Sequence, residues 1–234
     1  MTREEFLLEL EKINIKLTNK QLNSLDKYYE LLIEKNKKIN LTTITQKEEV
    51  YLKHFYDSLT ITKIINLNEN ISLADLGTGA GFPGIVLKIV FPNLNITLVD
   101  SLNKRINFLN EVIKELDLKN IKTVNSRIEE FSKSNIEKYD VLVSRAVSKT
   151  NIILELGTQA LKINGYFILM KGDIKEELKT STNAINKLGY NIKENLAFKL
   201  PKENSTRTLL KLQKISITNN IYPRDFAKIK KNPL

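Results

Sequence analysis

A glycine-rich turn between two apolar segments constrains the fold more than any other part of the chain. The turn lies within Asp75–Gly84, after a strand-like run over 71–76 and before a helix-like run over 85–91. Its glycines are Gly77, Gly79, Gly81 and Gly84. Because glycine has no Cβ, the backbone can bend sharply there and approach a ligand closely. Asp100 ends the next strand-like run, where doubly wound folds bind ribose hydroxyls, so the pattern predicts a nucleotide-binding corner.

The spacing of these glycines distinguishes two kinds of ligand. Dinucleotide sites use Gly-x-Gly-x-x-Gly and present free amides at a helix N-terminus to a pyrophosphate, whereas this turn alternates as Gly-x-Gly-x-Gly. Pro83 removes one such amide, and the Asp75 carboxylate beside the turn would repel a phosphate. S-adenosylmethionine has an ammonium group to face Asp75 and a ribose for Asp100 to bind. We therefore predict S-adenosylmethionine as the cofactor, with a plain α/β turn as the alternative.

The amino-acid composition limits the cellular compartment in which the protein is expected and the reactions that it can catalyse. The 234 residues, 41% hydrophobic and 27% charged, suffice for one α/β domain with an appendage. The chain has no apolar run of 18 residues, no signal-peptide pattern and no cysteine, which predicts a cytoplasmic protein outside the membrane. The absence of cysteine excludes methyl transfer to pyrimidine C5 through a cysteine nucleophile. With His54 as the only histidine, no metal site is predicted.

Positive charge is concentrated at the C-terminal end. The net charge is +10, and residues 191–234 carry 10 basic and 3 acidic side chains, a net +7. A basic terminal segment is typical of proteins that bind a polyanion, most often nucleic acid. The general excess of lysine in this chain explains the abundance of positive charge but not its segregation, so an RNA or DNA partner is favoured.

Hydrophobic periodicity predicts two regions, a helical N-terminal appendage over 1–66 and a Rossmann-like domain with a basic tail over 67–234. Three- and four-residue spacing predicts helices within 2–38, with Thr18 as an N-cap, and another over 48–65. The expected strands are 71–76, 95–100, 121–124, 139–144, 165–171, 192–200 and 206–214. The expected later helices are 84–91, 102–117, 150–162 and 174–188. This alternation predicts an α/β fold with a mainly parallel seven-stranded sheet that ends in an antiparallel hairpin.

Ligands of open α/β sheets lie at the carboxyl ends of the strands, which points to several side chains. Ile128 and Glu129 follow the third strand, where an apolar residue and an acid can bracket an adenine. A helix-start carboxylate is the alternative for Glu129. Arg145 follows a buried-looking strand and should face a ligand or a carboxylate, so a structural ion pair stays open. Lys171 ends the fifth predicted strand.

The residues after the fourth strand limit the methyl acceptor. Methyltransferases that act on exocyclic amino groups of bases usually carry an Asn/Asp-Pro-Pro-aromatic motif there, whereas this chain has Ser144-Arg145-Ala146-Val147. An acceptor with an in-plane lone pair, such as guanine N7, needs neither a general base nor a covalent intermediate. Catalysis then requires alignment of nitrogen, methyl and sulfur, and the exclusion of water.

In these motifs the chain resembles the bacterial 16S ribosomal RNA guanine-N7 methyltransferases of the glucose-inhibited division protein B type. The matching segments, in the family's order, are 40–42, 54–58, 75–84, 100–105, 126–129, 144–146, 169–172 and 222–224. The resemblance implies a class I S-adenosylmethionine-dependent methyltransferase fold. It also implies that the target is a guanine in the decoding-region loop of small-subunit RNA.

The motifs and the resemblance together give a set of predicted site residues. The cofactor-binding residues are Gly77, Gly79, Gly81, Phe82, Asp100, Ser101, Ile128, Glu129 and Arg145. The catalytic residues are Arg145 and Lys171, and the RNA-contacting residues are Asn40, His54, Arg127, Lys171 and Arg224. Position 128 is usually alanine in the family, and the tail after Arg224 lacks the family's Pro-Gly-x-Pro stretch.

Two other classes of function stay open beside an rRNA methyltransferase. A methyltransferase acting on a protein or a small molecule fits poorly with the basic C-terminal fifth. A non-enzymatic RNA-binding protein fits poorly with an intact glycine turn beside Asp75 and Asp100. The expected partner is 16S rRNA, either in the small ribosomal subunit or in its assembly intermediate, and the protein is expected to be a monomer.

Overall fold

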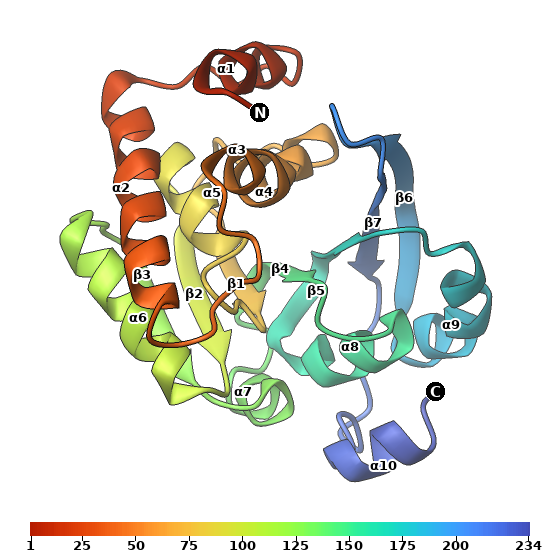
Figure 1. Cartoon of the computed structure of the whole chain (residues 1–234). Helices are drawn as coiled ribbons and strands as arrows, with labels where there is room; N and C mark the ends of the chain where they lie inside the picture. Colours follow the sequence, from red (N-terminus) through yellow and green to blue (C-terminus); the bar gives the residue numbers. More distant parts are fainter.

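A seven-stranded sheet organises the computed structural model, which describes residues 1–234. The strands are β1 (Ser72–Leu76), β2 (Asn95–Asp100), β3 (Ile121–Asn125), β4 (Tyr139–Arg145), β5 (Leu161–Lys171), β6 (Tyr190–Lys199) and β7 (Thr206–Lys214). Their order is β3-β2-β1-β4-β5-β7-β6 (Figure 1). The first five strands are parallel, and β7 is antiparallel to both β5 and β6. The predicted sheet and its terminal hairpin are confirmed.

Most helices lie where the sequence predicted them, but their first and last residues differ from the predicted ones. They are α1 (Arg3–Glu11), α2 (Asn19–Asn36), α3 (Lys47–Val50), the π-helix η1 (Tyr51–Tyr56), α4 (Asp57–Leu59), the 3-10 helix η2 (Thr60–Lys63), α5 (Gly84–Val90), α6 (Asn103–Glu115), α7 (Ile128–Ser134), α8 (Thr150–Gly157), the 3-10 helix η3 (Thr158–Ala160), α9 (Lys175–Lys187) and α10 (Phe226–Lys231). Helices α7 and α10 were not predicted from the sequence. The helix expected over 150–162 stops earlier because β5 begins at Leu161.

Local capping explains the first two helices. Thr2 and Thr18 each form a capping box, in which the threonine side chain accepts from the third helical N–H and that residue's side chain binds back. Thr18 is therefore the N-cap that the sequence predicted. Asn14 separates the two helices in a left-handed conformation, with φ at 59°.

Two hydrophobic clusters lie on the two faces of the sheet. Helices α1 to α6 cover one face through a cluster of 39 buried residues, in which Phe6 and Tyr28 from the N-terminal helices join Leu73 of β1. Helices α7 to α10 cover the other face through 21 buried residues, including the adjacent Ala74. The N-terminal helices thus share a core with the sheet, and a boundary near residue 66 stays a prediction. None of the helices has the length and apolarity needed to span a bilayer.

The parallel register brings the site segments to one edge. Leu76 at the end of β1 pairs with Val99, and Asp100 at the end of β2 pairs with Asn125. On the other side of β1, Arg145 ends β4. Because parallel strands end at the same edge, the turns after β1, β2, β3 and β4 open on one surface.

Candidate active site

The glycine turn after β1 needs glycine for conformation and for space. Gly77, Gly79 and Gly81 have φ values of 72°, 61° and 102°, in the region that other residues rarely adopt. A Cβ at Gly81 would lie 2.6 Å from the Ile85 side chain, so a substitution there would also clash. The N–H of Gly77 donates to the carbonyl of Val99 at 2.9 Å, which ties the turn to β2. The predicted turn is therefore fixed by its neighbouring strand.

Asp75 supports this turn from inside the protein. Its carboxylate is fully buried and accepts hydrogen bonds from the Gly84 N–H at 2.8 Å and the Thr78 hydroxyl at 2.7 Å. Burial raises the pKa of Asp75 to about 6. The carboxylate does not line the neighbouring cavity. The expectation that Asp75 faces the ammonium group of a ligand is thus wrong, because the side chain joins the turn to the start of α5.

A cavity of about 480 Å³, here called the turn cavity, opens at the carboxyl edge of the sheet. All of the predicted cofactor-binding residues except Gly81 line this cavity: Gly77, Gly79, Phe82, Asp100, Ser101, Ile128, Glu129 and Arg145. His54 and the exposed Arg127 also line it, although they were predicted as RNA contacts. The turn cavity therefore gathers residues from segments far apart in the chain, between positions 41 and 226.

Asp100 occupies the floor of this cavity with both carboxylate oxygens engaged. One oxygen accepts from the Gly79 N–H at 3.0 Å and lies 3.1 Å from a guanidinium nitrogen of Arg105. The other oxygen accepts from the Leu102 N–H at 2.9 Å. The side chain is nearly buried, with 4% of its surface exposed. The oxygen that accepts from Leu102 keeps a free lone pair, so the carboxylate can still accept from a ligand hydroxyl.

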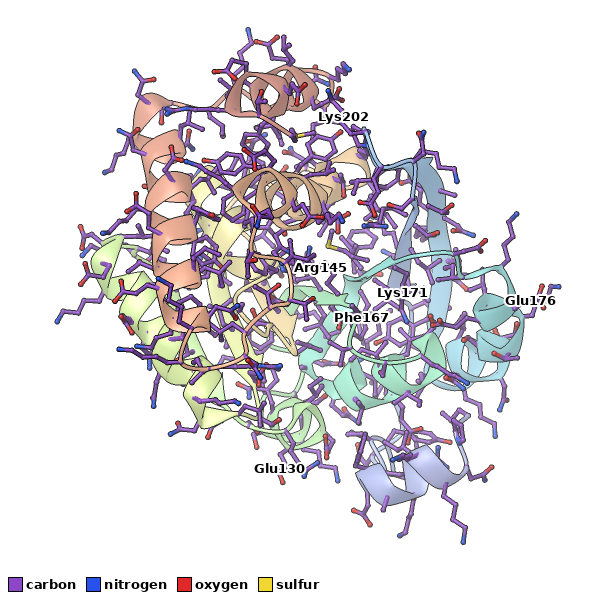
Figure 2. All side chains as sticks on the ribbon, in the orientation of Figure 1. Glu130, Arg145, Phe167, Lys171, Glu176 and Lys202 are labelled. Carbon is purple, nitrogen blue, oxygen red and sulfur yellow. The ribbon has the colours of Figure 1, made fainter.

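Arg145 connects the sheet to the N-terminal helices. Its guanidinium donates to the Lys53 carbonyl at 3.0 Å and to the Asp57 carboxylate at 3.3 Å. The guanidinium carbon also lies 5.1 Å from the centroid of the Phe82 ring. Figure 2 shows Arg145 in the middle of the molecule, between the N-terminal helices and the sheet. The ion-pair interpretation of Arg145 is confirmed. Because the side chain also lines the cavity, its contact with a ligand stays a prediction.

His54 lies beside this arginine in a neutral form. Its ring stacks on Phe82 with centroids 4.3 Å apart and an interplanar angle of 19°. The Thr42 hydroxyl lies 2.9 Å from Nε2 of the ring. Burial, reinforced by the charge of Arg145, lowers the pKa of His54 to about 3. A neutral imidazole can accept or donate one hydrogen bond but adds no charge to the site.

A second cavity of about 330 Å³, here called the arginine cavity, adjoins the first through His54, Arg145 and Ala146. It is further lined by Asp57, Lys171 and Arg207, among others. Lys171 lies 2.7 Å from the Glu177 carboxylate, and Arg207 lies 3.2 Å from Asp57. Figure 2 shows Lys171 close to Arg145 in projection. The cationic groups here are thus held by acidic partners.

The largest cavity, about 900 Å³, lies away from this region. It is at the amino ends of β1, β4 and β5 and is lined by Asp140, Lys162 and Lys211, among others. Lys162 is paired with Asp140 at 2.7 Å, and Lys211 donates to the Ile64 carbonyl. Open α/β sheets bind ligands at the carboxyl edge, so the two smaller cavities are the candidate active site.

Similarity to known proteins extends over most of the chain. The family described as rRNA small subunit methyltransferase G matches residues 21–207. A protein named ribosomal RNA small subunit methyltransferase G from Lysinibacillus sphaericus is 44% identical over 238 residues, covering 100% of both chains. A protein of the same name from Desulforamulus reducens is 48% identical over 93% of this chain and 92% of its own. This chain belongs to that family.

Solved structures with lower sequence identity to this chain have a similar fold. M. jannaschii TYW2 in complex with AdoMet superposes with a TM-score of 0.58 at 17% identity, over 74% of this chain and 80% of its own. Aeropyrum pernix fibrillarin with natively bound S-adenosyl-L-methionine gives 0.54 at 17% identity, over 67% and 72%. At such identities the likeness establishes the methyltransferase fold alone.

Two residues that were predicted to contact RNA line neither the turn cavity nor the arginine cavity. Asn40 is exposed and lines neither the turn cavity nor the arginine cavity. The neighbouring Asn36 holds the loop instead, because its side-chain oxygen accepts from the N–H groups of Leu41 and Thr42 at 2.8 and 3.0 Å. Arg224 is bound by the buried carboxylate of Glu155. Arg224 therefore has a structural role, and its contact with RNA stays a prediction.

Sequence reasoning missed four contributors to the site. Arg105, Asp57 and Arg207 surround the predicted residues, and Phe226 from the C-terminal tail lines the turn cavity. The scarcity of arginine was a usable signal, because the chain has six arginines against 31 lysines. Asp57 also lies within a segment matched to the family. No local pattern connects Phe226 with a turn more than 140 positions earlier.

Proposed function

We propose that this protein transfers a methyl group from S-adenosylmethionine to N7 of a guanine in the decoding-region loop of 16S rRNA. The observation that carries the proposal is the junction of two cavities at His54 and Arg145. The turn cavity holds the glycine turn and Asp100, and the arginine cavity holds cationic groups suited to RNA. Membership of the rRNA small subunit methyltransferase G family supports the same substrate.

The turn cavity fits S-adenosylmethionine in size and chemistry. Its volume falls within the roughly 300–1,000 Å³ of small-molecule sites. A Cβ added at Gly79 would meet nothing within 4 Å, so this part of the turn borders open space. We propose that Asp100 accepts a hydrogen bond from the ribose and that Ile128 and Glu129 flank the adenine. Gly77 and Ser101 also line the cavity and are proposed to contact the remainder of the cofactor.

The arginine cavity is the proposed site of the target base. When bound, S-adenosylmethionine supplies a methyl group on a positively charged sulfur. Guanine N7 already has a free lone pair, so no residue has to remove a proton. The nearby carboxylates are engaged, Asp57 by Arg145 and Arg207, and Glu177 by Lys171. Such a site supports alignment of the reactants better than general base catalysis.

We assign Arg145 and Lys171 as the residues that contact and orient the base. Lys171 is 10% exposed and Arg145 is 14% exposed, so both are largely removed from water. Each cation is paired with a carboxylate, which limits its repulsion of the positively charged sulfur and of the guanine that becomes positive. His54 is neutral for the reason given above and is placed between the two cavities.

The RNA is proposed to extend from this junction over the basic C-terminal region. Arg127 at the rim of the turn cavity and the lysines of α10 supply positive charge for phosphates. We infer that the protein acts as a monomer in the cytoplasm, on the small subunit or its assembly intermediate. The exposed lysines of α10 suit the sequence-independent part of such binding.

Two measurements test the proposed function. Calorimetric titration should detect binding of S-adenosylmethionine and no comparable binding of NADH. Mass mapping of small-subunit RNA, with and without the gene, should show one 7-methylguanosine that disappears with the gene and returns when purified protein and cofactor are added. NADH binding without a signal from S-adenosylmethionine, or an unchanged guanosine map, would contradict the proposal.

A further inference from the structure

The C-terminal tail returns to the turn cavity through one aromatic side chain. Phe226, the first residue of α10, lines the cavity together with Leu156 of α8 and Ile128 at the start of α7. Figure 1 shows α10 next to α8, at the end of the molecule opposite the N-terminus. The Phe226 side chain is 39% exposed, so a face of the ring is available for a further contact.

An ion pair with a buried carboxylate fixes Arg224, two residues before this aromatic side chain. The Glu155 carboxylate is fully buried and accepts from Nε of Arg224 at 2.7 Å, from Nη2 at 2.6 Å and from the backbone N–H at 3.1 Å. A planar guanidinium matched to both carboxylate oxygens restricts orientation as well as distance. Arg224 thus directs the chain two residues before Phe226.

The other side of the segment is also attached. Ile229 of α10 is fully buried in the cluster beneath α8, and the Leu234 carbonyl accepts from the Asn151 side chain at 3.0 Å. Phe226 therefore lies between two fixed points, although the surrounding tail residues are exposed. The segment holds an apolar ring at the opening of a cavity. Exposure of such a ring to water is unfavourable, so the attachments on both sides are needed to keep it there.

We propose that Phe226 is a cofactor-binding residue whose ring closes the adenine end of the turn cavity, and that the Glu155–Arg224 ion pair is the latch that holds it there. This inference rests on the proposed function, because it places adenine beside Ile128 and Glu129. An aromatic ring stacks on any base through its face, and a stacked ring also excludes water from the cavity.

Calorimetric titration of the full-length protein with S-adenosylhomocysteine tests the aromatic contact. Phe226→Ala should weaken binding roughly tenfold, within the range of base–aromatic stacking, and Phe226→Tyr should retain the wild-type affinity. Ile221→Ala is the matched control, because Ile221 is 63% exposed in the same tail and does not line the cavity. Wild-type affinity in a folded Phe226→Ala protein would overturn the inference. Absence of binding by the wild type would instead contradict the proposed function.

A double-mutant cycle tests the latch. Arg224→Ala should raise the KM for S-adenosylmethionine and leave the KM for RNA unchanged, because the latch acts on the cofactor wall. In a Phe226→Ala protein the same change should cause little further loss of S-adenosylhomocysteine affinity. Since Arg224→Ala leaves Glu155 buried and unpaired, the double variant Glu155→Gln, Arg224→Gln serves as a second, uncharged test. Additive losses, or no loss of cofactor affinity in either folded variant, would overturn the latch.

Discussion

The backbone N–H of Gly79 donates a hydrogen bond to the carboxylate of Asp100 over 3.0 Å. This bond joins the glycine turn after β1 to the acid that ends β2, so the two sequence signals form a single structural unit. Arg105 binds the same carboxylate oxygen, and the Leu102 N–H donates to the other oxygen. The group is therefore oriented before any ligand arrives, which reduces the entropy lost on binding.

Replacement of this carboxylate should weaken cofactor binding. Asp100→Asn keeps one acceptor oxygen but loses the charge and the second acceptor, so S-adenosylmethionine affinity should fall by about 1–3 kcal/mol. Calorimetric titration measures the loss. Asp117→Asn is the control, because the Asp117 side chain is 81% exposed and pairs only with Lys119. An Asp100→Asn isotherm that matches the wild type would exclude a role in holding the ribose.

Arg145 should matter more for methyl transfer than for folding. Arg145→Ala removes a group at the junction of both cavities, and we expect the rate of transfer per folded molecule to fall by roughly 100-fold, the scale of misplaced reactants. Stability should fall by only about 1–3 kcal/mol, because Arg207 still pairs with Asp57. Activity assays and thermal denaturation of the same preparations separate the two effects.

The control for this variant is Arg3→Ala, which removes a partly exposed ion pair with Asp26. It should change neither the transfer rate nor the stability by more than about 1 kcal/mol. If Arg145→Ala retains nearly wild-type transfer per folded molecule, Arg145 is only a structural ion pair with Asp57.

Local patterns predicted the parts of the site that lie within one segment. The glycine turn, the acid ending β2 and the alternation of strands and helices depend on neighbouring residues, and the structure agrees with them. Helix α7 escaped prediction because seven residues give too little periodicity, although Glu129 and Glu130 in its first turn were a usable signal.

Contacts between segments that are distant in the chain could not be predicted from local sequence patterns. His54 reaches Phe82 from a π-helical turn, and the sequence predicted an ordinary helix there. The position of Asp75 at the end of β1 suggested an acid that faces a ligand. Its close contact with Gly84 instead places the side chain beneath the turn. Arg224 and Glu155 lie 69 positions apart, so the use of the tail as a cavity wall depends on tertiary packing.

The neutral state of His54 should make stability depend on pH. Its pKa is lowered to about 3 by burial in the native state, against 6.5 ordinarily, so the unfolded chain binds more protons between these values. This contribution is complete above pH 6.5 and is lost as pH falls, by about 2 kcal/mol at pH 5. Asp75 acts in the opposite sense, since its pKa is raised to about 6 and the native state binds its proton more tightly.

Urea denaturation of wild type and His54→Asn at pH 8 and pH 5 isolates the histidine contribution. Asp75 is present in both proteins, so its effect cancels in the comparison. The wild type should lose about 2 kcal/mol more than His54→Asn on going from pH 8 to pH 5. Equal losses in the two proteins would mean that His54 is protonated in the folded state.

The lysines of α10 should supply part of the salt dependence of RNA binding. Lys228, Lys230 and Lys231 are exposed at the end of the chain, and such clusters bind phosphates without reading sequence. Replacing all three by glutamine should weaken RNA binding and flatten the slope of log affinity against log salt by roughly 2. Cofactor affinity should stay unchanged, because Phe226 and Arg224 are kept.

A matched triple variant separates position from total charge. Lys16, Lys119 and Lys138 are exposed, and Lys119 and Lys138 just precede β3 and β4, at the edge of the sheet opposite the glycine turn. Their replacement by glutamine removes the same charge, but it should leave the salt slope close to that of the wild type, because counterions are released only from phosphates that the protein contacts. Salt titrations of RNA binding by the three proteins give the slopes. If the tail variant and the control variant change the slope equally, the tail lysines act only through net charge and do not position the RNA.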